Sequence, residues 1–491
     1  MTFPLSRDEL AVWRRIRRYA VPRAMIEAAT AARLAGDWRA ACAAAGMSVA
    51  ADADFGPFAD DLRHLVPDLV RWHLPRSPGR GETTIDPRLL IVLARRGDRV
   101  LGVATPRVAF STQRLRLVVT YPGDTHYHGE RDWSAARHLW DDRETGELVA
   151  RTCGPDTLAR LDLQAAGRTR EAWAAAGVEV PEPRIERPYD FQERYVRRAF
   201  DTLDVDPAAV VAAAWASGRP ASSIALTFLD LRLHTVNGGP ARAEWVDGVT
   251  ADDTARMPVA PFLRPVDLHL VRHGRIYPAD LHPLIGPLLE PFFQAAGVPA
   301  AGDPTVRVRC GGDWHVLGWD GGRMRMPHSD GERQREDVLR ALGGEVHGCF
   351  AAEVAWADRS FRLPRRLEEQ RRDLLLRMLH GDLAAVVARL DAGVDPRARD
   401  AHGRTLAHLL PCVDWRPGWP ALLSRLLAAG LDLEARDATG RTPLHSAVHD
   451  DGSEELIQAL LAAGADPRSS DDHGQSIRED FEQLRGEPFP A

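Results

Sequence analysis

Two short stretches of this 491-residue chain combine side chains that could do chemistry. In the first, His126 and His128 stand two residues apart, so an extended strand would place both rings on one face. Such an His-x-His pair can hold zinc or iron, and Asp124 and Glu130 are close by in sequence. A polar turn is the commoner use of this pattern. The two histidines are therefore either candidate metal ligands or residues of a polar turn.

The second stretch, residues 266–278, leads from an apolar run into Arg272, His273 and Gly274. It resembles the opening of the histidine phosphatases, in which the histidine is phosphorylated and the arginine holds the phosphate. About ninety residues separate His273 from the repeats described below, too few for that fold, and Ile276 stands where the family has a hydroxyl-bearing residue nearby. The sequence favours a strand that ends in a solvated Arg–His pair.

The chain contains no lysine, so all 63 basic residues are arginine, and Asn237 is its single asparagine. A GC-rich genome explains most of such a bias, and selection against a lysine-directed modification is the alternative. Either way, a P-loop lysine, a kinase strand lysine and a Schiff-base amine are excluded. Arginine cannot replace them as a nucleophile because it stays protonated at any working pH. The sequence also has no Gly-x-Ser-x-Gly elbow and no zinc-protease helix.

The five cysteines are spread singly along the chain, without a Cys-x-x-Cys pair. An odd number of isolated cysteines is typical of reduced, buried residues that act as small apolar side chains. The sequence therefore predicts no disulfide, no structural zinc cluster and no cofactor. These cysteines are Cys42, Cys153, Cys310, Cys349 and Cys412.

Composition and charge narrow the class of protein further. No apolar run reaches the roughly 18 residues that a spanning helix needs, and the basic N-terminus is not followed by the apolar stretch of a signal peptide. We therefore expect a cytoplasmic protein without a membrane contact. Residues 430–491 hold fourteen Asp and Glu against five Arg. Nucleic-acid binding through this end is disfavoured, because phosphates would be repelled.

The elements that must position these residues change in type along the chain. Helical spacing of apolar residues predicts a helical N-terminal segment over residues 1–80. From about residue 85 the period changes to two, which predicts antiparallel strands that alternate with helices. One helix is expected at 284–296 and a three-strand meander after residue 305. Residues 81–360 therefore read as an α+β domain of unknown type.

The C-terminal segment repeats itself. An Asp-x-x-Gly turn recurs at spacings of 37 and 34 residues, and an isolated glycine before each turn keeps the same spacings. Two landmarks with one period indicate stacked copies of a helical unit, because each copy leaves an apolar helix face that only a neighbour can cover. The landmarks are Asp400/Gly403, Asp437/Gly440 and Asp471/Gly474, preceded by Gly393, Gly430 and Gly464.

Residues 442–447 read T-P-L-H-S-A and resemble the ankyrin signature at every fixed position. The resemblance covers about a quarter of the chain, residues 365–491. It is close for the unit 437–470, looser for 400–436, and partial for a leading helix pair at 367–399 and a cap at 471–487. It implies an all-α ankyrin repeat array after the α+β region, with His408 and His445 in a structural hydrogen-bonding role.

In ankyrin proteins the turn tips and the exposed side of the first helix bind the partner. Matching positions here nominate a set that we call the turn face: His402, Arg404, Thr439, Arg441, His449 and Asp450. The chain departs from the family between the two helices of the 400–436 unit, where Trp415, Arg416 and Trp419 lie in a longer loop. This composition is typical of a binding hot spot. Packing of both rings onto the stack is an equally open interpretation.

Taken together, these patterns predict a cytoplasmic, non-enzymatic adaptor that recruits a protein partner through the ankyrin array. The alternative is an enzyme or metal-dependent hydrolase with its site in residues 85–330 and the array as a targeting arm. In that case His126, His128 or the pair Arg272 and His273 would supply the chemistry.

Overall fold

The computed structural model describes residues 5–76, 83–153, 156–183, 190–226, 229–235, 241–247, 256–277, 280–292, 305–358, 362–486 and 488–489. The chain forms two compact units. The first comprises residues 1–105 and 115–298, and the second comprises residues 106–114 and 299–491. This division differs from the boundaries expected from sequence, because residues 299–360 belong to the same unit as the C-terminal repeats.

The first unit begins with helices, and a capping sequence marks the start of the first one. Ser6 accepts a hydrogen bond from the backbone of Glu9 at 3.1 Å, and the Glu9 carboxylate accepts one from Ser6 N–H at 2.9 Å. This capping box satisfies two free backbone donors at the helix start. The helices of this part are α1 (Arg7–Tyr19), α2 (Arg23–Leu34), α3 (Trp38–Ala44), η1 (Gly56–Phe58), α4 (Ala59–Arg63) and α5 (Pro67–His73).

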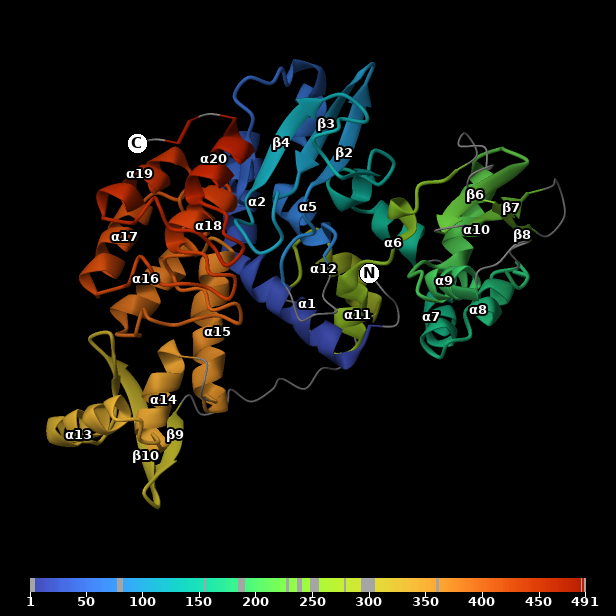
Figure 1. The fold of residues 1–491 in the computed structure, drawn as a ribbon. Helices are drawn as coiled ribbons and strands as arrows, with labels where there is room; N and C mark the ends of the chain where they lie inside the picture. Colours follow the sequence, from blue (N-terminus) through green and yellow to red (C-terminus); the bar gives the residue numbers. More distant parts are fainter. Residues whose placement is uncertain are drawn as a thin grey trace. The chain divides into compact units, whose positions relative to one another are not determined.

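A five-stranded sheet follows, in the order β1-β4-β3-β2-β5. Its three central strands pair antiparallel, as their alternating pattern predicts. The two edge strands instead pair parallel with their neighbours, which the sequence did not indicate. One face packs with the N-terminal helices around Leu93 and Leu101, and α5 lies beside the strands (Figure 1). The strands are β1 (Met47–Val49), β2 (Leu89–Arg96), β3 (Arg99–Ala104), β4 (Leu115–Thr120) and β5 (Gly129–Asp132).

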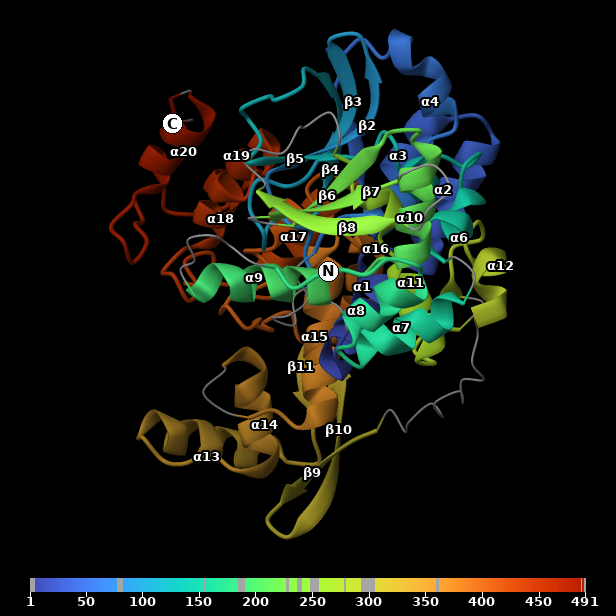
Figure 2. The same ribbon diagram turned by 90° about the vertical axis from the view of Figure 1, so that its right-hand side faces the viewer.

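A separate hydrophobic core within the first unit surrounds a three-stranded antiparallel sheet in the order β6-β7-β8. Helix α10 lies along this sheet (Figure 2). Two helices that pack on the first core come before it in the chain, η3 (Arg137–Leu139) and α6 (Glu147–Thr152). The elements that follow are α7 (Thr157–Ala165), α8 (Thr169–Ala175), α9 (Asp190–Asp201), α10 (Pro207–Ala216), β6 (Ala221–Leu226), β7 (Leu229–His234) and β8 (Arg242–Asp247).

The stretch that ends in Arg272 and His273 is a helix, α11 (Val266–Arg272), so the strand expected there is wrong. All residues from Val266 to Val271 are buried. A helix buried on every side has no polar face and no 3.6-residue pattern, which makes it read like a buried strand. The remaining elements of the unit are η5 (Ala260–Phe262), α12 (Gly286–Leu289) and η7 (Glu290–Phe292). The helix expected at 284–296 is this shorter pair, and its last residues lie outside the described part.

A buried ionic cluster joins α11 to the core of the first unit. The Asp204 carboxylate contacts Arg264 at 3.2 Å and His269 at 2.6 Å, and all three side chains are almost fully buried. Arg264 also donates to the side-chain oxygen of Gln164 at 2.8 Å. Buried charges of this kind are tolerated only while they are paired.

The second unit contains a small sheet in the order β11-β10-β9, with antiparallel registers, as the predicted meander requires. Its strands are β9 (Val306–Cys310), β10 (Asp313–Asp320) and β11 (Arg323–Arg325). Two helices follow, α13 (Asp330–Ala341) and α14 (Gly348–Ala357). Residues of the sheet and of α14 share one hydrophobic core with the repeats, which is why they group with the C-terminal segment.

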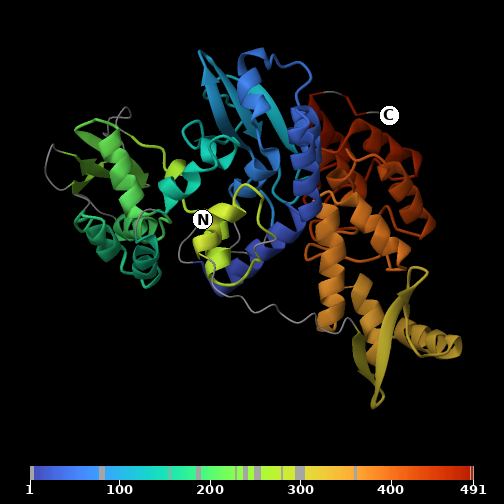
Figure 3. The same ribbon diagram turned by 180° about the vertical axis from the view of Figure 1, so that it is seen from behind.

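The repeat helices lie side by side in one stack (Figure 3). They are α15 (Arg365–Leu379), α16 (Leu383–Asp391), η8 (Leu410–Cys412), α17 (Trp419–Ala428), α18 (Pro443–His449), α19 (Glu454–Ala462) and α20 (Ile477–Arg485). The unit 400–436 has turns and the short 3-10 helix η8 where an ankyrin unit has its first α-helix. Pro411 accounts for this difference, because proline inside a helix removes a donor and clashes with the preceding turn. Among the described residues, no helix is both long and apolar enough to cross a bilayer.

Replacing one member of the buried ionic cluster tests its role. Asp204→Asn keeps the shape but removes the only carboxylate paired with His269 in this cluster and the nearer of the two beside Arg264, whose other one is the buried Asp206 at 3.9 Å. We therefore expect a loss of about 3–5 kcal/mol in the free energy of unfolding of the first unit. Urea denaturation measures this loss. Asp162→Asn in the same unit removes a carboxylate that is 64% exposed and pairs with Arg272. It should have a much smaller effect, and equal losses in the two variants would contradict the assignment.

Candidate partner-binding face

The three Asp-x-x-Gly turns have one shared geometry. In each, a single aspartate oxygen accepts hydrogen bonds from the backbone N–H groups two and four residues later, at 2.8–3.1 Å. The following glycine has a positive φ of 77–78°, a conformation that favours glycine. The aspartates are Asp400, Asp437 and Asp471. The repeated landmarks of the sequence therefore correspond to a repeated structure.

Backbone and arginine contacts join each turn to the next one. The N–H of Ala438 donates to the carbonyl of His402 at 2.7 Å, and the N–H of Asp472 donates to the carbonyl of Thr439 at 3.0 Å. Arg399 donates to its own turn and to the next unit, both at 2.9 Å, and Arg436 does the same at 3.0 and 2.9 Å. These ties fix the spacing of the turn tips.

His408 adds a further hydrogen bond between neighbouring units, below the turns. Its Nδ1 accepts the N–H of Thr405 at 3.1 Å, and its Nε2 lies 3.0 Å from the carbonyl of Arg441 in the next unit. One nitrogen must accept and the other must donate, which requires the neutral ring. Burial lowers the pKa of His408 to about 4, in keeping with that state. This is the structural role that the ankyrin resemblance implies.

The nominated turn-face residues differ in how far they are exposed. His402 and Thr439 stand exposed at successive turn tips. Arg404 is buried and pairs with Asp400 at 2.7 Å, whereas Arg441 is half-buried beside Asp471 at 3.6 Å. Farther along, the ring of His449 contacts the carboxylate of Asp450 at 3.1 Å. Contact with a partner through these residues stays a prediction.

The tryptophan loop of the 400–436 unit packs largely onto the preceding unit. Trp415 donates to the carbonyl of Cys412 at 3.1 Å, and its ring lies so close to Gly381 that a Cβ there would be 2.9 Å from it. The Arg416 guanidinium lies 3.8 Å above the same ring and donates to the Gly381 carbonyl at 3.2 Å. Trp419 is half-buried against the shared core. These contacts favour the local-core interpretation, and the hot-spot role is untested.

A segment from elsewhere in the sequence contacts the turn face. Residues 106–114, which we call the cis segment, belong to the second unit although they join β3 to β4. The ring of Phe110 lies 4.9 Å from that of His402, and the Phe110 carbonyl accepts a hydrogen bond from Arg404. The guanidinium of Arg114 lies 5.7 Å from the Trp415 ring.

The other end of the cis segment reaches the connection between α18 and α19. Arg107 pairs with Asp451 at 3.7 Å, one residue beyond the nominated Asp450. Nothing in the sequence marks these contacts, since residues 106–114 read only as a strand connection. The cis segment is thus the part of the site that sequence reasoning missed.

The chemical candidates of the sequence are not brought together. His126 bonds to Asp124 at 2.5 Å with its side chain 87% exposed, whereas His128 accepts a hydrogen bond from Arg88 at 2.8 Å. Among the described residues, neither histidine belongs to a group of three side chains able to hold a metal. Arg272 at the end of α11 pairs with Asp162.

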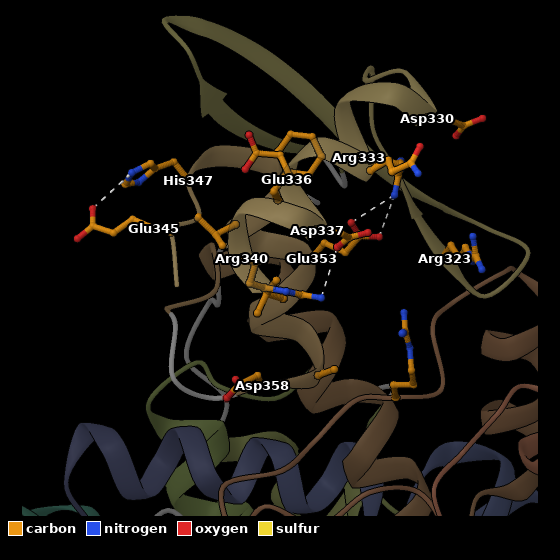
Figure 4. A pocket seen from close by; sticks show the side chains of 17 residues that line it. Arg323, Asp330, Arg333, Glu336, Asp337, Arg340, Glu345, His347, Glu353 and Asp358 are labelled. Atoms are coloured by element: carbon orange, nitrogen blue, oxygen red, sulfur yellow. Dashed lines mark hydrogen bonds and ion pairs between the residues drawn. The ribbon is translucent and has the colours of Figure 1, made fainter. Parts of the chain in front are cut away.

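A cleft of about 1170 Å³ lies between α13 and α14 in the second unit. Its wall carries both signs of charge, and many of these charges are paired (Figure 4). Arg333 bonds to Glu353 at 3.0 Å, Arg340 lies 3.4 Å from Asp337, and His347 lies 3.5 Å from Glu345. Paired charges at an open surface are the ordinary state of solvated side chains. The cleft is therefore a weaker candidate than the turn face.

Comparison with known proteins agrees with the repeat geometry. The family model of the ankyrin repeat matches residues 439–472, which begin inside the turn at Asp437/Gly440, contain helices α18 and α19, and end in the next turn. An ankyrin repeat is generally a protein–protein interaction module. No curated protein matches the chain.

Two glycines with the same backbone conformation test the packing of the turns. Gly440 and Gly474 both have φ +78°, but a Cβ at Gly440 would lie 2.7 Å from the backbone nitrogen of Asp472 and still closer to its carboxylate, whereas one at Gly474 meets nothing within 4 Å. We expect Gly474→Ala to cost about 1 kcal/mol through the backbone alone. Gly440→Ala should cost about 1–3 kcal/mol more. Urea unfolding of the repeats measures both, and equal costs would contradict the close contact between turns.

Stability should also fall in acid because of His408. Its pKa is about 4 when folded and about 6.5 when unfolded, so the unfolded chain binds the extra proton between these values. The free energy of unfolding is therefore expected to drop by about 2–3 kcal/mol as the pH falls from about 6.5 to 4. His408→Gln should flatten the pH dependence in this window, and the exposed His473→Gln should leave it unchanged. A slope unaltered by His408→Gln would show that another group is responsible.

Proposed function

We propose that the chain is a non-enzymatic adaptor whose ankyrin segment recruits a protein partner through the turn face. The observation that supports this most directly is that the turn face already contacts polypeptide. The ring of Phe110 in the cis segment lies tilted against that of His402, and the Phe110 carbonyl accepts a hydrogen bond from Arg404. A surface that contacts an aromatic side chain and a backbone carbonyl together has the chemistry needed to bind another protein.

In this proposal the cis segment and the partner use overlapping parts of the turn face. The cis segment contacts His402 and Arg404 of the turn face and the neighbouring Trp415. Its Arg107 also pairs with Asp451, next to Asp450. At the next unit, Thr439 is exposed, and His449 and Asp450 are half-buried. A partner would bind first at these later residues and then displace Phe110. The affinity for the partner would thereby depend on how firmly the cis segment is held.

Adaptor function in the cytoplasm is part of the same proposal. None of the five cysteines, all of which lie in the described part of the chain, forms a disulfide, as a reducing compartment favours. The alternative of an enzyme with a site in residues 85–330 gains no support from its candidates His126, His128, Arg272 and His273. His126, His128 and Arg272 each bond to a different side chain, and these contacts do not bring the four residues into one site. We therefore carry the adaptor proposal alone.

Variants of the face and of the cis segment should have opposite effects on partner recovery. Thr439→Arg with His449→Glu should abolish co-purification of partners by the tagged full-length chain. Arg107→Ser with Phe110→Ser should raise it, by about 5- to 30-fold if releasing the segment is worth about 1–2 kcal/mol. Quantitative mass spectrometry of the recovered proteins is the measurement.

Glu455→Arg, at an exposed position of α19, is the matched control for a change of charge, and circular dichroism checks folding in every variant. Recovery that is the same for the wild type and the Thr439/His449 variant would reject the turn face as the binding surface. Recovery that fails to rise after release of Phe110 would reject only the competition by the cis segment.

A further inference from the structure

Four side chains with nitrogen or sulfur donors converge in the second unit. They come from the end of β9, from β10, from the residues after β11 and from the first turn of α14: Cys310, His315, His328 and Cys349. Their donor atoms all lie within 4.8 Å of one another. Cys310 Sγ is 3.5 Å from His328 Nε2, His315 Nδ1 is 3.1 Å from His328 Nε2, and Cys349 Sγ is 3.4 Å from His315 Nδ1.

These distances can be compared with the edges of a tetrahedral zinc site. Zinc bonds of about 2.3 Å to sulfur and 2.0–2.1 Å to nitrogen, at tetrahedral angles, place neighbouring donor atoms about 3.3–3.8 Å apart. The three contacts fall at or slightly below this range. Two thiols and two imidazoles are also the donor set of many structural zinc sites.

Strand alternation explains why these residues meet. Successive side chains of a strand point to opposite faces, so every second residue shares one face. Cys310 continues the buried series Val306 and Val308, and His315 stands two residues before the buried Leu317. The polar donors thus extend the inward face of the meander toward the turn that joins β9 to β10.

His328 follows the same rule after β11, two residues beyond the buried Met326. Its side chain is only 10% exposed, and its ring lies 4.7 Å from that of Phe350. Cys310, His315 and His328 therefore all lie on the inward side of the meander.

Helix α14 supplies the fourth donor at very close range. Cys349 is fully buried in the first turn of this helix. Gly348 before it has φ +57°, and a Cβ there would lie 2.6 Å from Cys310 Sγ. Glycine is therefore required for the strand end and the helix start to approach this closely. A close approach of this kind is what a shared ligand between the two elements needs.

We propose that Cys310, His315, His328 and Cys349 form a structural zinc site of the Cys2His2 type. Binding releases one proton from each thiol, so that two thiolates and two neutral imidazoles surround a Zn²⁺ ion and the site is neutral overall. All four positions are filled by protein side chains, which leaves no place for a catalytic water. The ion fastens the meander to α14.

The small size of this region gives the zinc a physical purpose. Helix α13 contributes no buried residue, and Val338, Leu339 and Leu342 at its end are exposed. The meander adds five buried apolar side chains to the core that it shares with the repeats: Val306, Val308, Leu317, Met324 and Met326. A metal adds stability where one part of a structure contributes so few apolar contacts. Here α14 is also the helix that connects the meander to the repeats through Trp356, whose indole donates to the Asp395 carbonyl at 3.0 Å.

A second group of possible donors shows the contrast. His64, Asp141 and Asp142 also lie close together in the described part of the chain. Their carboxylates are paired with arginine, with Asp142 bonded to Arg33 and Asp141 bonded to Arg143. Arginine has already neutralised the charge that a cation would need. In the Cys310 group, by contrast, the donor atoms contact one another, and the carboxylate near them is that of Glu332, 3.9 Å from His328.

The test is metal analysis of the purified full-length chain, followed by exchange with cobalt. We expect about one zinc per chain, lost in Cys310→Ser and in Cys349→Ser. It should be retained in Cys42→Ala and in His347→Gln, an exposed histidine two residues from Cys349. After exchange, Co²⁺ in the wild-type chain should show the intense d–d bands of a tetrahedral site and thiolate charge-transfer bands.

The cobalt spectrum of the wild-type chain keeps the proposal testable if a variant fails to fold. Weak octahedral bands, or zinc far below one equivalent in the reduced chain, would overturn it in favour of a hydrogen-bonded cluster without metal. An intact mass two hydrogens lighter, with Cys310 linked to Cys349 in peptide mapping, would overturn it in favour of a disulfide. None of these outcomes depends on whether the turn face binds a partner.

Discussion

The second unit depends on the aspartate that closes each turn. A single carboxylate oxygen of Asp400, Asp437 or Asp471 accepts two backbone hydrogen bonds, which satisfies N–H groups at the turn tip that would otherwise need water. The tip is then rigid, and its remaining carbonyl accepts a hydrogen bond from the next unit. Stacking of the helices and spacing of the exposed tips follow from this one arrangement.

A rigid set of turn tips favours binding because little conformational freedom is lost when a ligand is held. The contact with Phe110 illustrates this, since the same turn that is closed by Asp400 presents both His402 and Arg404. Arg404 is fixed by Asp400 and needs no reorganisation to donate to a carbonyl. The structural role of the aspartate and the proposed role in recognition are therefore linked.

The proposed zinc site and the repeats are parts of one packed body. Trp319 of β10 and Trp356 of α14 have ring centroids 4.4 Å apart, and both lie in or against the core that continues into α15 and the later repeat helices. A change that loosens the meander would thus be felt at the first repeat helix. In this way a metal could support an interaction surface without contacting it.

Some of this organisation was predictable from sequence because it depends on local patterns. Neighbouring residues are enough to predict the capping box at Ser6, the alternating strands at 89–120 and the repeated turns at Asp400, Asp437 and Asp471.

The rest depends on contacts between distant residues. Buried helix α11 lacks a polar face and reads as a strand, and Pro411 replaces an expected helix by η8. The donors Cys310, His315, His328 and Cys349 are separated by 5, 13 and 21 residues, so that only the strand pairing and the turn at Gly348 bring them together. The cis segment has no pattern at all.

The most direct measurement of the central claim is the coupling between Phe110 and the turn face. A double-mutant cycle with Phe110→Ala and His402→Ala, followed by urea unfolding of the full chain, isolates the energy of this ring contact. We predict a coupling of about 0.5–1.5 kcal/mol, as for other paired rings. Strictly additive losses would show that the turn face does not hold the segment, and would contradict its use as a polypeptide-binding surface.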